Sequence, residues 1–584
     1  MRILTGLAAS GKTTLILREI AEKAEANRGR QILLVPELNS HQMERRLAAA
    51  THNHGARTAE VLTFSRLADR VFAVVGGLAQ QMLTPAGQLL TLQEAARRVQ
   101  LGLTAWNGLA DKPELLGEAL SLIDECKTCM VSPDALFRAS EESELDEDAA
   151  LSAKLSDLAQ LLTMYDSLCD ESLPDPRDRL TRLRDGLAES RVLDGAEVYL
   201  DGFLSYTPQE LAIIEVMVSL NVPLTAAVTC DTELPDVFVT GCKTLRTLTR
   251  MAERHDRRPE IVNLGASRLS RPAGLAAVAE EALLPVRGTH EDASGVRLYE
   301  AASPFDECEH AAAYIRRKVR DEGARYRDFV VAARDIAPYS ASLAMAMGRY
   351  DIPMFLADKP DLLSRPPMAL VMGALESVRS NFGYKELFGC FKTGLAGLEH
   401  DEIDRLENYV ITWKIRGAAW ERDWVENPDG YGIPLDDAAR AQLSELNELR
   451  ARAIAPFAAL RERLKGEQPS ADCVRALYDF LLAVDAQQRM EQRAAEHERA
   501  GRLQLADEYR QLWEILVSAM EQFAWVRSEM PLTLDRFAQL FRLVLGGYSV
   551  GSIPVSLDRV SCGNIERVCG ENVKYVILLG VNEG

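Results

Sequence analysis

The chain has 584 residues, of which 47% are hydrophobic and 26% charged, and its formal net charge is −20. A chain of this length is too long to fold around a single hydrophobic core, so we expect roughly three to four domains. No apolar run could span a membrane and no secretory signal is recognisable, which predicts a cytoplasmic protein without a membrane partner. The acidic balance excludes a protein that coats nucleic acid through its overall charge, but it allows a basic channel inside an acidic shell.

The first element of the chain carries a phosphate-binding signature. Residues 6–13, Gly-Leu-Ala-Ala-Ser-Gly-Lys-Thr, satisfy G-x-x-x-x-G-K-[ST], after the apolar run Ile3-Leu4 and before an apolar-periodic stretch. A strand, loop and helix in this order lets backbone N–H groups surround phosphates, while the Lys reaches the β- and γ-phosphates and the Thr ligates Mg²⁺. A chance match in a Gly/Ala-rich start is the alternative. We predict an ATP–Mg²⁺ site formed by Gly6, Ala9, Ser10, Gly11, Lys12, Thr13 and Thr14.

Alternating strand and helix signals follow this loop. Buried strands are expected at 31–36, 59–64, 196–201 and 224–229. Helices are expected at 39–50, 65–75 (which Ser65 would cap) and 208–220. Between 84 and 189 the strand signals disappear and helical periods dominate. The pattern predicts a parallel α/β sheet interrupted by a helical insertion.

A second α/β region is expected from the remaining sequence. Strands are predicted at 296–299, 329–333 and 574–580, and helices at 305–322, 436–465 (which Pro456 should kink or break) and 486–523. The predicted domains are a first α/β domain at 1–83 and 190–290 with its insertion at 84–189, and a second at 291–365 and 545–584 with its insertion at 366–544. Because the sequence stops directly after a predicted strand, we expect further protein to follow.

Several segments, in their order along the chain, resemble one protein family. They are GLAASGKTT, LLVPELNSHQME, AEVLTFSRLADRV, YLDGFLSYTPQE, LENYV with Trp413 nearby, and VKYVILLGVNEG. The domain order is similar to that of superfamily 1 UvrD-type DNA helicases, and the segments resemble most the AddB subunits of bacterial AddAB helicase–nucleases. The P-loop is shared by many families, whereas DGF-x-x-[FY]-T-P-Q and the ordered set are specific.

The resemblance implies a fold, a function and partners. The fold would be α/β, with two P-loop (RecA-like) parallel-sheet domains, each interrupted by a mainly helical insertion. The protein would act in DNA repair, resecting double-strand breaks for homologous recombination, with an AddA-type helicase–nuclease subunit as partner and duplex ends and single-stranded DNA as ligands. The last helicase motif, a RecB-type nuclease domain and a cysteine-ligated iron–sulfur cluster would lie in the protein that follows.

A working helicase motor also needs a strand that ends in Asp-Glu, in which the Asp holds Mg²⁺ and the Glu polarises the attacking water. Here the strand ends in Asp201 and Gly202, so the metal-binding residue is present and the general base is not. We predict that Thr13 and Asp201 bind Mg²⁺; the alternative for Asp201 is a turn residue. Glu210, on the next helix, is an alternative base.

Two further helicase motifs are degenerate. A turn that normally contains Asp and Gln keeps Asp231 but has no Gln, and the Gly-x-Glu turn near the end reads Gly570-Glu571-Asn572. We therefore expect nucleotide binding with weak or absent hydrolysis, and no catalytic residue is assigned. Whether this chain is an enzyme stays open.

DNA contacts are predicted at the strand-to-helix junction after residue 62, where the helicases carry their first strand-gripping motif. Hydroxyls and a helix start can hold phosphate and an aromatic ring can stack a base, although Phe64 could equally be core and Ser65 a cap. The predicted DNA-binding residues are Thr63, Phe64, Ser65 and Arg66. Arg334 would approach the nucleotide from the second sheet, or else pair with a neighbouring Asp. The basic run at 316–320 is interpreted as a solvated helix face.

Three hypotheses follow. The leading one is a silent motor that threads single-stranded DNA and recognises a Chi-like sequence, beside a partner that supplies the active motor. The second is an active ATP-dependent helicase with an unusual base. The third is a nucleotide-dependent scaffold without a DNA role.

Overall fold

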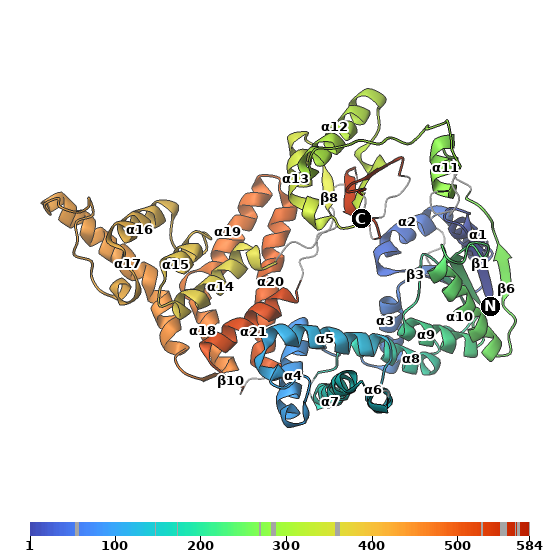
Figure 1. Ribbon diagram of the computed structural model, residues 1–584, viewed down its shortest axis with the longest axis horizontal. Coiled ribbons are helices and arrows are strands. Elements are labelled where there is room, and N and C mark those ends of the chain that lie inside the picture. Colours follow the sequence, from blue (N-terminus) through green and yellow to red (C-terminus); the bar gives the residue numbers. More distant parts are fainter. Residues whose placement is uncertain are drawn as a thin grey trace. The chain divides into compact units, whose positions relative to one another are not determined.

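The computed structural model describes residues 1–52, 58–145, 148–171, 173–267, 270–281, 288–356, 362–526, 530–548, 558–566, 568 and 573–582. The chain divides into two compact units (Figure 1). Unit 1 comprises Met1–Leu83 and Leu92–Arg297, and unit 2 comprises Thr84–Thr91 and Leu298–Gly584. Each unit contains a parallel β-sheet and many helices, so the α/β class is confirmed. The finer division into four domains stays a prediction.

The sheet of unit 1 has six parallel strands in the order β3-β2-β4-β5-β1-β6. The strands are β1 (Arg2–Gly6), β2 (Arg30–Leu34), β3 (Ala59–Leu62), β4 (Ala196–Leu200), β5 (Leu224–Thr229) and β6 (Glu260–Asn263). Five of them were expected from buried apolar runs. The edge strand β6 has a mostly exposed pattern, which gives no such signal. In this register Leu34 pairs with Leu200, Leu200 with Ala226 and Gly6 with Thr229, so β1 and β5 extend three residues beyond the ends of β2 and β4.

Helices cover both faces of this sheet. They are α1 (Lys12–Glu25), α2 (Ser40–Ala50), α3 (Phe64–Val75), α9 (Pro208–Ser219) and α10 (Val239–Arg254). A further helix of unit 1 is α11 (Ala273–Glu281). On one face Leu4 and Leu33 pack with Ile16 of α1, and on the other Ile3 and Val198 pack in a separate core. The prediction that Ser65 caps α3 is wrong, because the N-cap is Thr63, whose hydroxyl accepts a hydrogen bond from the Arg66 amide.

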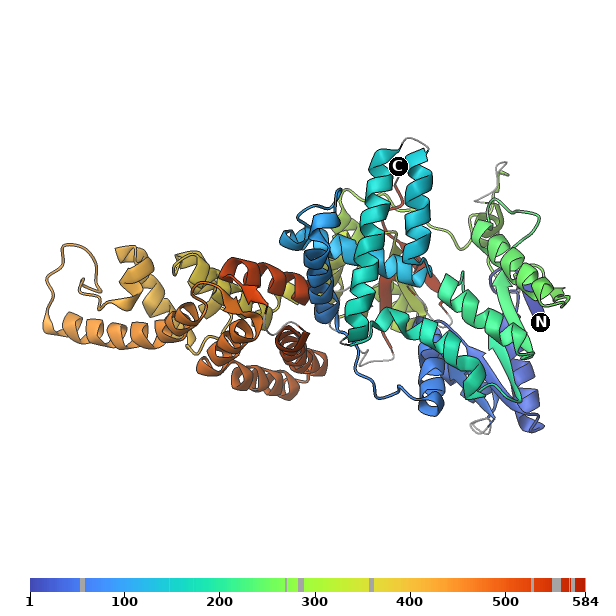
Figure 2. The ribbon, with the colours of Figure 1, turned by 90° about the horizontal axis from the view of Figure 1, so that it is seen from below.

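Residues 84–190 form the expected helical region. Its helices are α4 (Pro85–Arg98), α5 (Pro113–Thr128), α6 (Pro133–Leu145), α7 (Ala149–Glu171) and α8 (Arg179–Ser190). Figure 2 shows α6 and α7, in cyan and teal, lying side by side. Lys127 of α5 is buried among the carboxylates of Asp166, Asp175 and Asp178. Among the described residues, the helices are all too short or too polar to cross a membrane.

The sheet of unit 2 has four parallel strands in the order β12-β7-β11-β8. These are β7 (Phe329–Ala333), β8 (Met354–Leu356), β11 (Val560–Asn564) and β12 (Tyr575–Leu578). Its main core packs against α12 (Pro304–Glu322) and α13 (Ser340–Arg349). The predicted strand at 296–299 is wrong. Residues 296–299 are not in a strand, and Leu298 is 93% exposed.

The rest of unit 2 is helical. It contains α14 (Pro366–Arg379), α15 (Tyr384–Phe391), α16 (His400–Trp413), α17 (Asp437–Arg463), α18 (Ser470–Ala483), α19 (Ala486–Arg499), α20 (Leu503–Val526) and α21 (Leu534–Gly546), with the short strands β9 (Gln468–Pro469) and β10 (Pro531–Leu532). Pro456 does not end α17, which buries Phe457 and Leu460 beyond it. The single helix expected at 486–523 is two helices, because the chain turns at Gly501, whose φ is +73°.

Candidate nucleotide-binding site

The predicted P-loop lies between β1 and α1, as the sequence motif requires. Gly6 has φ +145° and Gly11 has φ +95°, angles that L side chains rarely adopt. A Cβ at Gly6 would also lie 2.7 Å from the Ser10 hydroxyl oxygen. The Leu7 amide donates to the Gly265 carbonyl at 3.1 Å, which ties the loop to the chain after β6. The two motif glycines are therefore required by the backbone of the loop.

Lys12 holds its ammonium inside this loop. The Lys12 Nζ donates to the carbonyl oxygens of Gly6 at 2.9 Å and Leu7 at 2.8 Å, and the residue is only 8% exposed. Burial lowers the pKa of Lys12, while the Asp201 carboxylate and the Cys230 thiol oppose that shift. Its third contact is to the Ser10 hydroxyl at 3.4 Å, and a desolvated cation held by neutral oxygens interacts strongly with an incoming phosphate.

Asp201 follows β4 at the same edge of the sheet and is 3% exposed. Burial raises the pKa of its carboxyl group, against the opposing effects of a hydrogen bond from Thr13, the charge of Arg46, the Gly202 amide and Lys12. Its Oδ2 is buried and has no hydrogen-bond partner among the residues that the structure describes. An orphaned carboxylate oxygen beside a hydroxyl suits Mg²⁺, which binds proteins through one or two oxygen ligands together with phosphate and water. Within the described residues, groups of three or more His, Cys, Asp or Glu that could hold a metal ion are absent.

A side chain at the position after Asp201 would be strained by its backbone conformation and would be tightly packed. Gly202 has φ +82°, and a Cβ there would lie 3.2 Å from Asn39 Nδ2 and 3.4 Å from Pro36 Cδ. Glu210, the alternative base, is engaged in a capping box. Its carboxylate accepts from the Thr207 amide at 2.8 Å, and its own amide donates to the Thr207 hydroxyl at 3.2 Å. Its position is explained by the start of α9.

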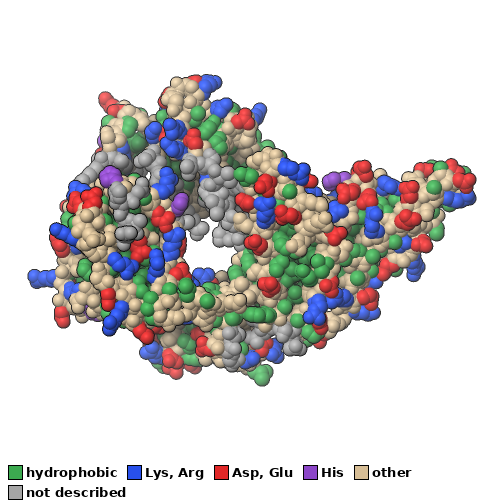
Figure 3. Space-filling view, turned by 180° about the vertical axis from the view of Figure 1, so that it is seen from behind, with side chains coloured by type: hydrophobic (Ala, Val, Ile, Leu, Met, Phe, Trp, Pro, Cys, Tyr) green, Lys and Arg blue, Asp and Glu red, His purple; other side chains and the backbone are tan. Residues whose placement is uncertain are grey.

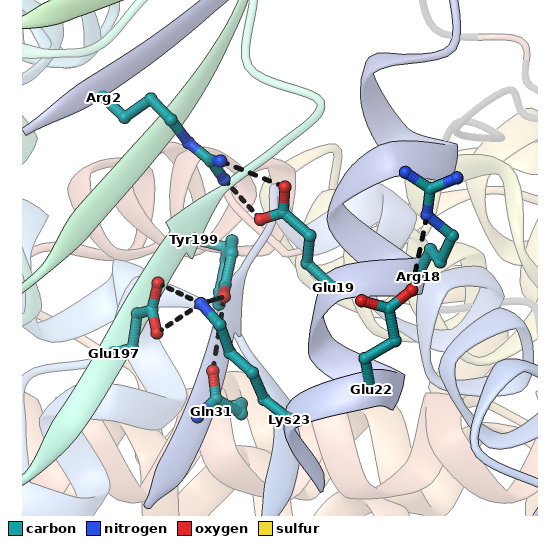
Figure 4. A network of polar contacts seen from close by, with 8 residues as sticks. All are labelled: Arg2, Arg18, Glu19, Glu22, Lys23, Gln31, Glu197 and Tyr199. Atoms are coloured by element: carbon teal, nitrogen blue, oxygen red, sulfur yellow. Dashed lines mark hydrogen bonds and ion pairs between the residues drawn. The ribbon is translucent and has the colours of Figure 1, made fainter. Parts of the chain in front are cut away.

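Side chains of α1 tie the helix to the sheet (Figure 4). Lys23 of α1 reaches both carboxylate oxygens of Glu197 at 2.7 Å and the Tyr199 hydroxyl at 2.9 Å. Tyr199 in turn donates to Gln31 of β2 at 3.3 Å. Glu19 of α1 accepts from Arg2 of β1 at 3.0 Å. Three strands therefore fix the orientation of the helix that follows the P-loop.

The other predicted nucleotide contacts differ in exposure. Ser10 is fully buried, whereas Ala9 and Thr14 are exposed; Ala9 has φ +60°, which is strained for a residue with a Cβ. Arg334 is an exposed residue of unit 2 that directly follows β7. It has no ion pair among the described residues, and the neighbouring Asp335 accepts from the Ala337 amide. Its approach to a nucleotide stays a prediction.

The predicted DNA-binding residues lie at the start of α3. Thr63 is 1% exposed and Phe64 5%, and the Phe64 ring packs edge-on against Phe203 with 5.7 Å between ring centroids. Ser65 is half-buried, and Arg66 is exposed and paired with Glu44. The structure places Phe64 in the core, so in this conformation only Ser65 and Arg66 have substantial surface for a ligand. Their binding to DNA stays a prediction.

Two residues near the site gave no usable sequence signal. Arg46 of α2 affects the pKa of Asp201, and Cys230, which follows β5, affects that of Lys12. The order of the strands in the sheet brings both residues close to the site, and a sequence motif does not encode that order. Asp231 accepts from the Glu233 amide at 2.9 Å and so forms a turn. The Gly570-Glu571-Asn572 motif lies outside the described residues.

These observations define an α/β protein with a P-loop at the carboxyl edge of a parallel sheet. Comparison with protein families narrows the class, since residues 3–277 match the family model described as ADDB, N-terminal. This region of the chain is similar to that family, which confirms the resemblance recognised in the sequence.

Similarity to named relatives extends over the full chain. Proteins named as the B subunit of an ATP-dependent helicase/deoxyribonuclease are 30% identical over 600 residues in Acetivibrio thermocellus, 31% over 604 residues in Desulforamulus reducens and 32% over 608 residues in Desulforudis audaxviator. Each alignment covers 100% of this chain and 52% of the relative. The chain thus spans about half the length of these relatives.

Proposed function

We propose that this chain is the helicase-like part of one component of a DNA-end-resecting helicase–nuclease, and that it binds ATP–Mg²⁺ without acting as a motor. The observation that carries the proposal is that the same edge of the sheet has a buried lysine, Lys12, in the P-loop after β1 and a buried carboxylate, Asp201, after β4, where Gly202 stands in the position of the general base. Similarity to the B subunits of helicase/deoxyribonucleases supports the DNA-directed part.

The binding chemistry follows from the residues of the loop. Lys12 would exchange its carbonyl partners for the β- and γ-phosphates, and loop amides would hold the phosphate oxygens. Thr13 and Asp201 would hold Mg²⁺, which supplies charge neutralisation of the phosphates. Hydrolysis would be slow because the loss of a general base typically costs about 10²–10⁴-fold in rate.

On DNA, the protein would guide the unwound single strand and recognise a Chi-like sequence, with an AddA-type subunit supplying the motor. A nucleotide site that does not hydrolyse ATP causes no repeated conformational change, so the protein can stay in one conformation while it contacts the bases. Ser65 and Arg66 would contact the strand, with Thr63 and Phe64 supporting them from the core, and Arg334 would approach the nucleotide from a second RecA-like domain. The iron–sulfur cluster would belong to the part that the longer relatives have beyond the matched half.

Binding and hydrolysis of ATP, measured side by side with and without single-stranded DNA, test this proposal. Lys12→Ala should lose ATP binding, and no variant should show DNA-stimulated turnover. The matched control is Arg18→Ala, which removes an exposed cation from the same helix outside the loop and should keep ATP binding.

Other outcomes would favour the rival hypotheses. Vigorous turnover that Lys12→Ala abolishes would mean an active helicase. Absence of single-strand binding at low salt, where phosphate contacts are strongest, would mean a scaffold without a DNA role.

A further inference from the structure

Helix α10 carries a stripe of cations along one face. Successive basic residues are separated by three or four positions, which places them on one side of a helix at 3.6 residues per turn. We call this set the α10 stripe: Lys243, Arg246, Arg250, Arg254 and, in the turn that follows the helix, Arg257. The opposite face of α10 is buried and includes Leu245, Leu248 and Met251. The stripe therefore faces away from the core of unit 1.

Most of the stripe is not neutralised by carboxylates. Arg254 pairs with Glu215 at 3.1 Å and Arg246 donates to the Cys242 carbonyl at 3.2 Å. Among the described residues, no ion pair is found for Lys243, Arg250 or Arg257. The chain as a whole has a net charge of −20, and over the face shown in Figure 3 basic and acidic side chains are interspersed.

The spacing and residue types suit a phosphate backbone. The helical part of the stripe runs for about 16 Å at 1.5 Å per residue. Over that length a DNA duplex presents about ten phosphates, at one charge per 1.7 Å. Arginine matches phosphate oxygens with a two-pronged donor set, and the stripe is mainly arginine. Residues 243–258 contain no Phe, Tyr or Trp that could stack an unpaired base.

We propose that the α10 stripe is a binding site for the phosphate backbone of duplex DNA, independent of base sequence and of nucleotide. The proposal deepens the DNA-directed part of the proposed function and does not depend on the P-loop. An acidic protein segment is the other polyanion to consider. Protein interfaces have an apolar core, and the exposed large apolar side chains found on α10 comprise Val239 alone among the described residues.

The test measures binding of the whole chain to a labelled blunt duplex, without nucleotide, between about 50 and 200 mM salt. The variant Lys243→Gln, Arg246→Gln, Arg250→Gln should lower the slope of log affinity against log salt by about 2.7, at 0.9 per phosphate contact. Affinity at low salt should fall at least about tenfold, since three charge-assisted contacts are lost. Binding should weaken equally for unrelated duplex sequences.

The matched control removes the same charge elsewhere, through Arg316→Gln, Arg317→Gln, Arg320→Gln on α12. There Arg316 donates to the Tyr326 hydroxyl at 2.7 Å and Arg320 pairs with Asp321 at 2.6 Å. This variant should bind duplex DNA as the unaltered chain does. Equal loss in both variants would show that overall charge, and not the stripe, sets affinity, and would overturn the proposal.

Two further variants keep the result interpretable. Arg246→Lys, Arg250→Lys retains the charge and should retain the salt slope, which separates lost charge from lost folding. Lys12→Ala should leave duplex binding unchanged, so failure of the nucleotide site and failure of the stripe are distinguishable. If the Gln variant binds duplex DNA normally but loses binding to poly-glutamate, the stripe serves an acidic protein and the proposal is wrong.

Discussion

The carboxyl edges of the two sheets differ in how their polar groups are satisfied. In unit 2, Asn564 accepts from the Ile336 amide at 2.9 Å and Glu307 accepts from the Gly580 amide at 2.6 Å. In unit 1, Lys12 is held only by loop atoms and one oxygen of Asp201 has no hydrogen-bond partner in the part of the chain that the structure describes. Buried polar groups are normally paired, so the edge of the first sheet keeps binding capacity that the second has used internally.

A buried aspartate next to each sheet, Asp201 after β4 and Asp328 before β7, shows a similar contrast through its pKa. Burial raises the pKa of Asp201, because Thr13, Arg46, the Gly202 amide and Lys12 compensate only in part. Burial would also raise the pKa of Asp328, but the Arg325 amide and the Lys574 ammonium outweigh it and lower that pKa. A buried carboxylate whose hydrogen bonds are not all made within the fold can bind a ligand. A carboxylate whose hydrogen bonds are made within the fold stabilises the folded state.

The largest expected effect is on Asp201. Asp201→Asn should weaken Mg²⁺-dependent ATP binding by about 10- to 100-fold, the range typical for loss of a group that orients a metal. The ligand-free variant should be at least as stable as the unaltered chain, since an unsatisfied buried carboxylate is removed. Calorimetric titration and thermal unfolding measure the two quantities. A large loss of stability with normal binding would assign Asp201 a structural role.

Asn564→Ala should have the reverse effect. Because the Ile336 amide would lose its acceptor inside the fold, the free energy of unfolding should fall by about 1–3 kcal/mol, with ATP affinity unchanged. The comparison variant is Asn263→Ala, which removes an exposed acceptor of the Gly265 amide and should cost less than about 0.5 kcal/mol. Denaturant unfolding distinguishes them, and equal losses would contradict the reasoning from burial.

Asp328→Asn should make stability less dependent on pH. Since the folded pKa of Asp328 lies below its ordinary value of 3.8, its contribution is present above that value and is lost as the pH falls through the folded pKa. The variant should be less stable by about 1 kcal/mol near neutral pH, the typical value of one hydrogen bond, and the difference should close in acid. A difference that widens on acidification would mean the opposite shift.

The smallest expected effect is that of Gly202→Glu on ATP turnover. This variant introduces the carboxylate that the helicase motif lacks here, but not in the position that a general base needs. The positive φ and the nearby Pro36 and Asn39 atoms prevent that side chain from taking a base position, so ATP turnover should stay at the unaltered level. Phosphate release assays with single-stranded DNA measure it. Turnover that appears in this variant would show that only the residue type was lacking.

The sequence predicted those features of the fold that are encoded by residues close together in the chain. The P-loop glycines and Lys12 are fixed by a continuous motif, and β1 and α1 were predicted correctly. The apolar runs of β2, β4 and β5 identified central strands, because strands covered on both faces are apolar throughout. The edge strand β6 was missed and a strand at 296–299 was wrongly expected, because strand formation there depends on a neighbour far away in sequence.

The site was predictable only in part for the same reason. Asp201 could be placed because it follows a central strand at a motif position. Ser65 was predicted to cap α3, but Thr63, two positions earlier, is the N-cap. The geometry of the preceding turn determines which of these residues caps the helix. Arg46 lies near Asp201 because β2, which precedes its helix, pairs with β4. That pairing joins segments far apart in the sequence and could not be predicted from it.

The bond from the Leu7 amide to the Gly265 carbonyl has a consequence for exchange with solvent. Glycine-rich loops usually exchange their amide hydrogens quickly, but this amide is bonded to the chain after β6 and exchanges only when that hydrogen bond breaks. In deuterated water Leu7 should therefore exchange on the timescale of the β6 edge rather than of a free loop. The short segment after β6 would then set how often the loop opens to admit a nucleotide.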